Sequence, residues 1–158
     1  MTRVIAAIIA IACADVITAC SWFGGGSSST GAESVFAVRP GQCFAAPTKV
    51  HAELSSLQRT PCAAPHGQEA YAVVPYLDAK HAGGSAYPGA DALGAFADSA
   101  CAQKFGGYVG VDYLDSRLFF TYLVPSPRSW EQGTDRNVIC FITSTSGPSS
   151  QSAKGSKE

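Results

Sequence analysis

The cysteines constrain the fold of this chain more than any other feature of its sequence. Six are present in 158 residues: two fall within the first 20 residues and four are spread from position 43 to position 140. An even number of cysteines in a small exported domain is typical of a disulfide framework. The four cysteines outside the first 20 residues are the ones that we expect to form it: Cys43, Cys62, Cys101 and Cys140.

Three pairings of these four cysteines are possible. We expect the sequential one, because Cys43–Cys62 would join two neighbouring extended segments and Cys101–Cys140 would join a predicted helix to the last predicted strand. Closing loops of these sizes stabilises a fold by roughly 3 and 4 kcal/mol in the chain-entropy treatment. A zinc site on Cys62 and His66 is the alternative, but no cysteine pair has C-x2-C spacing. We therefore expect no metal and no cofactor.

The N-terminus has the pattern of an export signal. Arg3 precedes an uncharged apolar run at residues 4–14, which has the length of a signal-peptide core and is too short to span a bilayer. The sequence ITAC, which ends at Cys20, resembles a bacterial lipobox, so a diacylglyceryl group (with palmitate as a typical acyl chain) would be attached there. We predict a lipoprotein signal peptide at residues 1–19 and a lipid anchor at the outer face of the membrane. Soluble secretion and an uncleaved anchor helix are the alternatives.

Two low-complexity segments border the part of the chain that can fold. Residues 20–34 hold the lipidated cysteine and a Gly/Ser-rich tether, and residues 144–158 are predicted to form a disordered tail. The remaining 109 residues, 35–143, are enough for one hydrophobic core but too few for two domains.

Within residues 35–143 the apolar pattern predicts several strands and one helix. Apolar residues recur at three- and four-residue spacing over residues 91–105, and Gly106 and Gly107 are expected to end this helix. Residues 117–124 are apolar on both faces, so we expect a central strand there. The other predicted extended segments are residues 48–54, 58–62, 68–77, 108–112 and 137–143, with a turn at residues 129–133.

Strands, one helix and further strands indicate an α+β fold: a small antiparallel sheet with one main helix packed on it and two disulfides. The chain carries 11 Lys and Arg against 12 Asp and Glu, which gives a net charge of −1. It therefore lacks the basic surface that nucleic-acid binding needs. The sequence also lacks the H-E-x-x-H, G-x-S-x-G and phosphate-loop motifs of common enzymes.

Several short phrases occur in an order typical of one family: Gly41-x-Cys43-Phe44, Cys62-x-x-Pro65-His66-x-x-Glu69, Tyr87-Pro88-Gly89, Ser129-Trp130 and Asp135-Arg136-x-Val138-x-Cys140. The sequence resembles the septum formation family, small exported or membrane-anchored domains of actinobacteria, over residues 41–142. It departs from that pattern at Thr134, an extra residue before Asp135, and at Ala70, where a β-branched residue is usual. The resemblance implies a role in septation and the cell envelope, with no chemistry that can be transferred.

Five residues are candidates for binding. His66 and Glu69, three positions apart, could form an acid–base or ligand pair, but we favour a structural role in holding the disulfide loop. Asp135 and Arg136 could bind an anionic envelope group, although an ion pair or bonds to backbone groups are the simpler interpretation. Trp130 could be an exposed ligand platform, but a lid over the core is the interpretation that we favour.

We therefore predict a non-catalytic, lipid-anchored envelope domain that binds an unknown envelope or division protein or a wall component. One alternative is an enzyme that modifies envelope polymers with His66, Glu69 and Asp135, which requires a concave pocket joining His66 to another ionisable group. Another is a small-ligand or lipid carrier, which requires an enclosed apolar cavity.

Overall fold

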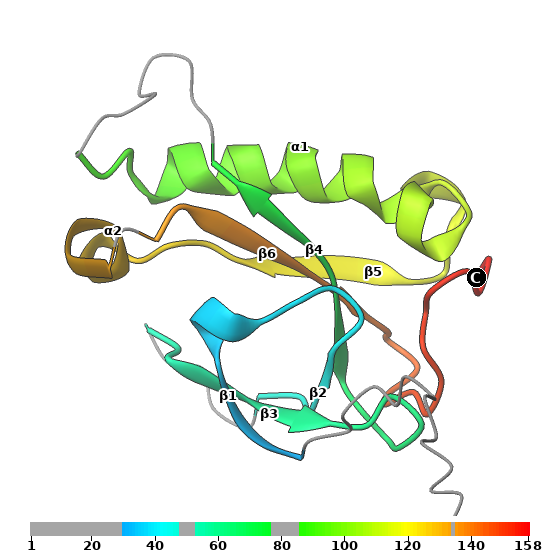
Figure 1. Ribbon diagram of the computed structural model, residues 1–158. Coiled ribbons are helices and arrows are strands. Elements are labelled where there is room, and N and C mark those ends of the chain that lie inside the picture. The colour runs from blue at the N-terminus through cyan, green and yellow to red at the C-terminus, as the bar shows by residue number, and fades with distance from the viewer. Residues whose placement is uncertain (1–29, 48–52, 77–85, 134) are drawn as a thin grey trace, which may run out of the picture.

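A computed structural model describes residues 30–47, 53–76, 86–133 and 135–158 (Figure 1). These residues form an antiparallel sheet of six strands in the order β1-β3-β2-β4-β6-β5, with one long helix packed on it. The predicted α+β fold is confirmed. No helix in the described part of the chain is long and apolar enough to cross a membrane. The elements are β1 (Gly31–Ser34), η1 (Val35–Ala37), β2 (Cys43–Phe44), β3 (Ser56–Thr60), β4 (Gln68–Pro75), α1 (Ala90–Val109), η2 (Tyr113–Asp115), β5 (Phe119–Leu123), α2 (Pro127–Gly133) and β6 (Asn137–Thr143).

Strand β6 lies between β4 and β5 at the centre of the main core, and it is buried on both faces. Cys140 and Ile142 pack on the side of α1, whereas Ile139 and Phe141 pack on the opposite side. This alternation explains why the NVICFIT sequence is almost wholly apolar, and it confirms the strand predicted at residues 137–143.

Helix α1 covers one face of the sheet with a single apolar stripe. Its buried residues recur at every fourth position, within the helical pattern that the sequence predicts. They are Leu93, Ala97, Cys101, Phe105 and Val109.

The end of α1 differs from the prediction. The helix runs past Gly106 and Gly107 to Val109, and Gly110, with φ +95°, ends it in the left-handed conformation that glycine adopts readily. Carbonyls in the last turn accept hydrogen bonds from the far end of the chain: Gly155 N–H donates to Tyr108 O and Lys157 N–H to Val109 O. These donors satisfy carbonyl groups that a helix end otherwise leaves without partners. Residues 108 and 109 lie in the helix and residues 110–112 lie in no strand, so the extended segment predicted at 108–112 is wrong.

Strand β5 is an edge strand, so the central position predicted for residues 117–124 is wrong. Phe120 and Tyr122 pack on the α1 side and Leu123 on the other. A strand that is covered on both faces is apolar on both faces, whether it has a neighbouring strand at one edge or at two. Residues 129–133 lie in α2 rather than in a turn.

The predicted strand at residues 48–54 falls mostly outside the described residues. Glu53 and Leu54, which are described, are in no strand. The strand in this region is β3, which begins at Ser56, two residues before the predicted strand 58–62, and ends at Thr60. Strand β4 confirms the strand predicted at residues 68–77 over Gln68–Pro75; Tyr76 lies in no strand, and position 77 is outside the described residues.

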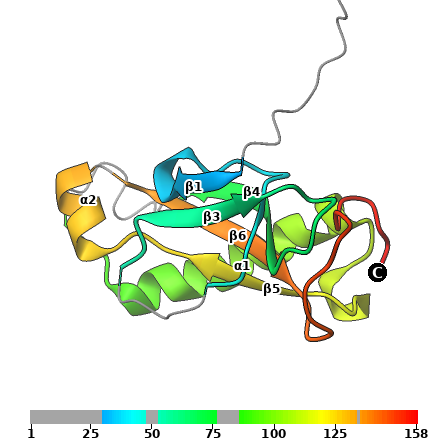
Figure 2. The same ribbon diagram turned by 90° about the horizontal axis from the view of Figure 1, so that it is seen from below.

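Residues 144–158, here called the C-terminal strap, pack against the domain, so the prediction of a disordered tail is wrong. Ser149 forms a β-bridge with His66, and Ala153 is buried in the core under α1. Figures 1 and 2 show the strap, in orange and red, running from the end of β6 to the C-terminal end of α1.

The face of the sheet opposite α1 carries a second, smaller core. Figure 1 shows the end of the sheet formed by β1 and β3 on the side of β4 and β6 that faces away from α1. Phe44 and Phe141 meet there edge to face, with ring centroids 5.9 Å apart. The residues buried in this core are Val38, Phe44, Leu57, Ala70, Ile139 and Phe141.

The predicted sequential pairing of the cysteines is confirmed. Cys101–Cys140 joins α1 to β6, and both cysteines are fully buried. Cys43–Cys62 joins β2 to the segment after β3, and Cys62 is partly exposed. The thiols on which the alternative zinc site depended are therefore in disulfides.

Candidate functional site

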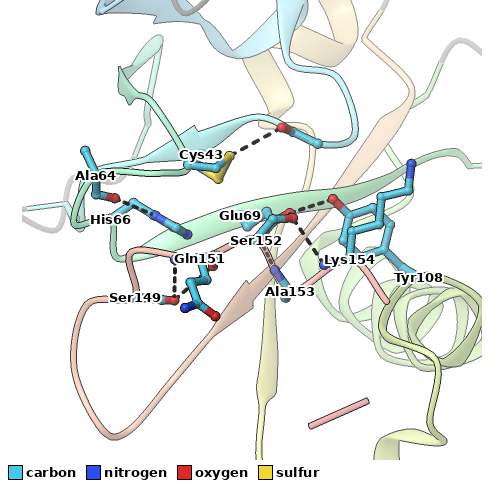
Figure 3. Close-up of a disulfide and its surroundings, with 12 residues drawn as sticks. Cys43, Ala64, His66, Glu69, Tyr108, Ser149, Gln151, Ser152, Ala153 and Lys154 are labelled. Atoms are coloured by element: carbon cyan, nitrogen blue, oxygen red, sulfur yellow. Dashed lines mark hydrogen bonds between the residues drawn. A yellow bond between two sulfur atoms is a disulfide. The ribbon is translucent and has the colours of Figure 1, made fainter. Parts of the chain in front are cut away.

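The His66 side chain is 5% exposed and lies just before β4. Its Nδ1 is 2.9 Å from the carbonyl oxygen of Ala64 (Figure 3). A carbonyl oxygen only accepts, so Nδ1 carries the proton and Nε2 of the neutral ring is an acceptor. The backbone next to His66 is held in place by close packing. Gly67, the next residue, lies so close to Ala46 that a Cβ atom at Gly67 would be 2.6 Å from the Ala46 Cβ, so only glycine fits without rearrangement.

The Glu69 carboxylate, 2% exposed, connects three separate parts of the chain. It accepts hydrogen bonds from the Tyr108 hydroxyl of α1 at 2.6 Å, and from the Ser152 hydroxyl and the Ala153 N–H of the strap, the latter at 2.7 Å (Figure 3). Burial, together with the hydrogen bond to Glu69 and the charge of that carboxylate, raises the pKa of Tyr108. Glu69 therefore fastens the strap and α1 to β4.

A polar cavity of about 330 Å³ opens beside these two residues. It is bounded by the strap, the start of β4 and the segment before β5. Arg117 and Glu158 form an exposed ion pair at 3.4 Å and also line the cavity. The pocket that the enzyme alternative requires, one joining His66 to another ionisable group, is thus present.

The region beside this cavity contains a group of side chains of the kinds that metal ions use as ligands. Within the described residues, the ligand atoms of Cys43, His66 and Glu69 all lie within 4.8 Å of one another. Cys43 is in a disulfide and offers no thiolate, so a metal here would depend on the imidazole and the carboxylate.

Trp130, Asp135 and Arg136 form a second cluster at the other end of the domain. Trp130 is 2% exposed, and the Arg136 guanidinium lies 3.7 Å from the centre of its ring. This burial fits a lid over the core and leaves no exposed aromatic platform.

The Asp135 and Arg136 side chains bind backbone and serine groups rather than each other. Arg136 Nη1 donates to the carbonyls of Trp130 and Asp135, both at 2.8 Å. Asp135 accepts from the Asn137 N–H at 3.1 Å and from the Ser129 hydroxyl at 3.3 Å. Of the two structural interpretations, bonds to backbone groups is the one that these contacts match.

A groove of about 410 Å³ lies on the face of the sheet opposite α1, next to this cluster. Asp135, Ser129 and Asn137 are among its polar lining residues. Its apolar lining comes from η1, β4, β5, β6 and nearby segments. These residues are Val35, Phe36, Val38, Leu54, Val73, Leu123, Val124 and Ile139.

The structure therefore brings together some of the predicted site residues and not others. His66 and Glu69 line the first cavity, whereas Asp135 lines the groove, so the three do not form one acid–base set. Cys20 lies outside the described residues. The strap was missed because its serine-rich sequence has no apolar period. The signal that could have found it was Glu69, an acidic residue at the start of a strand too apolar to expose it.

The septum formation family matches residues 40–158, three quarters of the chain. The chain belongs to this family. The matched region includes the strap. No curated protein and no solved structure matches the chain. Membership of the septum formation family suggests a role related to cell division.

Proposed function

We propose that this protein is a non-catalytic domain, anchored by a lipid on Cys20 to the outer face of the cell membrane, that binds a protein partner at the division septum. The septum formation family supports the link to division. The signal-like segment and the ITAC sequence ending at Cys20 support the anchor, and the Gly/Ser-rich residues after it suit a tether between membrane and domain.

The observation that supports a non-catalytic role is that Glu69 accepts structural hydrogen bonds from α1 and the strap. Three donors from α1 and the strap already occupy its carboxylate. Asp135, the other candidate acid, binds Asn137 and Ser129 near the groove. Both carboxylates hold the fold together, so protonating either one during general acid–base catalysis would break hydrogen bonds on which the fold depends.

The groove opposite α1 is the surface that best suits a partner. Its lining combines polar residues such as Asn137 with apolar residues, of which Leu54, Val73 and Leu123 are only partly buried. Protein-binding surfaces usually combine apolar and polar groups.

The test combines localisation with crosslinking. The full-length protein with a photo-crosslinking residue at Leu54 should concentrate at septa and capture a partner. A Leu123→Arg variant should lose that partner while its membrane attachment is unchanged. The same crosslinker at Glu131, an exposed residue of α2, serves as the control position. Even distribution around the envelope, with normal septa after deletion of the gene, would contradict the proposal.

An enzyme is the second candidate, favoured by one observation: His66 lines a polar cavity and its Nε2 has no hydrogen-bond partner among the described residues. A His66→Asn variant decides this. Asparagine keeps a donor for the Ala64 carbonyl but lacks the Nε2 atom. An envelope-polymer activity that disappears in this variant, with an unchanged melting temperature, would replace the binding proposal.

A further inference from the structure

We propose that His66 and Glu69 bind a divalent metal ion of the zinc class at the inner end of the cavity beside the strap. This inference does not depend on the proposed function. It follows from the charge and the free lone pairs of two buried side chains.

The first step concerns the charge of Glu69. Its carboxylate is 2% exposed, and no lysine or arginine of the described residues forms an ion pair with it. Buried charges in proteins are normally paired with an opposite charge or coordinate a metal ion. His66 is a metal-ligating side chain beside it: a ring nitrogen and a Glu69 carboxylate oxygen lie within 4.8 Å, and no hydrogen bond joins the two side chains.

The second step concerns lone pairs. A carboxylate offers about four lone-pair sites, and the three hydrogen bonds to Glu69 use three of them. On His66 the bond from Nδ1 to Ala64 leaves the Nε2 lone pair free. A backbone carbonyl that holds the other ring nitrogen is the usual outer partner of a metal-binding histidine. Two neighbouring side chains therefore each keep one lone pair that a cation could use.

The donor set selects the kind of ion. An imidazole nitrogen suits Zn²⁺, Cu²⁺ or Ni²⁺, whereas Ca²⁺ and Mg²⁺ prefer a shell of oxygen ligands. The Cys43 sulfur lies beside the two ligands, but its disulfide removes the thiolate that would make a closed structural zinc site. Water from the cavity would complete the coordination.

The test is calorimetric titration of the full chain with Zn²⁺, in mild detergent and with both disulfides formed. We expect one zinc ion per chain. His66→Asn should abolish this binding because it removes Nε2 and keeps the donor to Ala64. Glu131→Gln, on the exposed face of α2, is the matched control and should bind as the unchanged protein does. Absence of zinc binding to the unchanged protein, or full binding by His66→Asn, would overturn the proposal.

Two further measurements keep the test decisive if His66→Asn fails to fold. The double variant His51→Ala/His81→Ala removes every other histidine of the sequence, and it should bind zinc unchanged. The zinc X-ray absorption spectrum of the unchanged protein should show one imidazole nitrogen with oxygen ligands. Loss of binding in the double variant, or a sulfur ligand in the spectrum, would place the zinc elsewhere and overturn the assignment.

Discussion

The two disulfides close the same sheet in opposite surroundings. Cys101–Cys140 lies in an apolar core where both cysteines are fully buried between α1 and β6. Cys43–Cys62 lies at a polar corner, beside the buried His66 and Glu69, and Cys62 is partly exposed. The first region is held by packing, which needs only apolar residues at the right spacing. The second is held by three hydrogen bonds to the Glu69 carboxylate of β4, one from α1 and two from the strap.

The largest expected effect is at the apolar end. Replacing Cys101 and Cys140 by alanine should lower the free energy of unfolding by about 4 kcal/mol, because the disulfide closes the longer loop. Replacing Cys43 and Cys62 should cost about 3 kcal/mol. Urea denaturation of both variants measures the difference. Equal losses of unfolding free energy would contradict the expected difference between the two disulfides.

The polar corner should depend on Glu69 nearly as strongly. Glu69→Ala leaves a hydroxyl of α1 and two donors of the strap unpaired, so we expect a loss of about 3 kcal/mol in the free energy of unfolding. The strap should also become sensitive to protease at Lys154 and Lys157, while the rest of the domain stays resistant.

Limited trypsin digestion followed by mass spectrometry checks this, with Glu131→Ala as the control. If the strap of Glu69→Ala is cut no faster than that of the control, Glu69 does not hold it.

Gly67→Ala tests the close approach that positions His66 and Glu69. Its Cβ would lie 2.6 Å from the Ala46 Cβ, and backbone atoms of Ala46 are nearly as close, so the chain must shift. Overpacking of this kind costs about 2 kcal/mol. A matched change at Gly133, where a Cβ meets nothing within 4 Å, should cost much less in a thermal melt. Equal melting temperatures for the two variants would show that the backbone at Gly67 adjusts freely.

The smallest effect concerns pH. The pKa of Tyr108 is raised in the folded protein, so the folded state keeps its proton where the unfolded chain loses it. Stability from this group is therefore complete below about pH 10 and falls as the pH rises above it. Burial raises the pKa of Tyr71 in the same direction.

Tyr108→Phe should cost about 1 kcal/mol at neutral pH through the lost hydrogen bond to Glu69. It should also make the alkaline decline shallower, with the remaining decline due in part to Tyr71. Unfolding curves recorded from pH 7 to pH 11 check both effects. An alkaline decline as steep as that of the unchanged protein would show that Tyr108 does not titrate differently in the two states.

Much of the apolar region could be predicted from the sequence because its signals are local. The spacing of Leu93, Ala97 and Cys101 indicates a helix face, and the run of residues in β6 indicates a buried strand. The cysteine order favoured the pairing that the structure has. The edge position of β5 could not be predicted, because apolar faces carry no information on which strands lie beside it.

The sequence by itself predicts an export signal, and it determined the two-disulfide α+β domain and the resemblance that the septum formation family match confirms. Only the tertiary structure decided the polar corner. Ala153 binds Glu69 across 84 residues of chain, and Tyr108 binds it across 39. No periodicity or composition reports contacts at that separation. A serine-rich segment that can be solvated as a tail is ordered here because a buried carboxylate needs its donors.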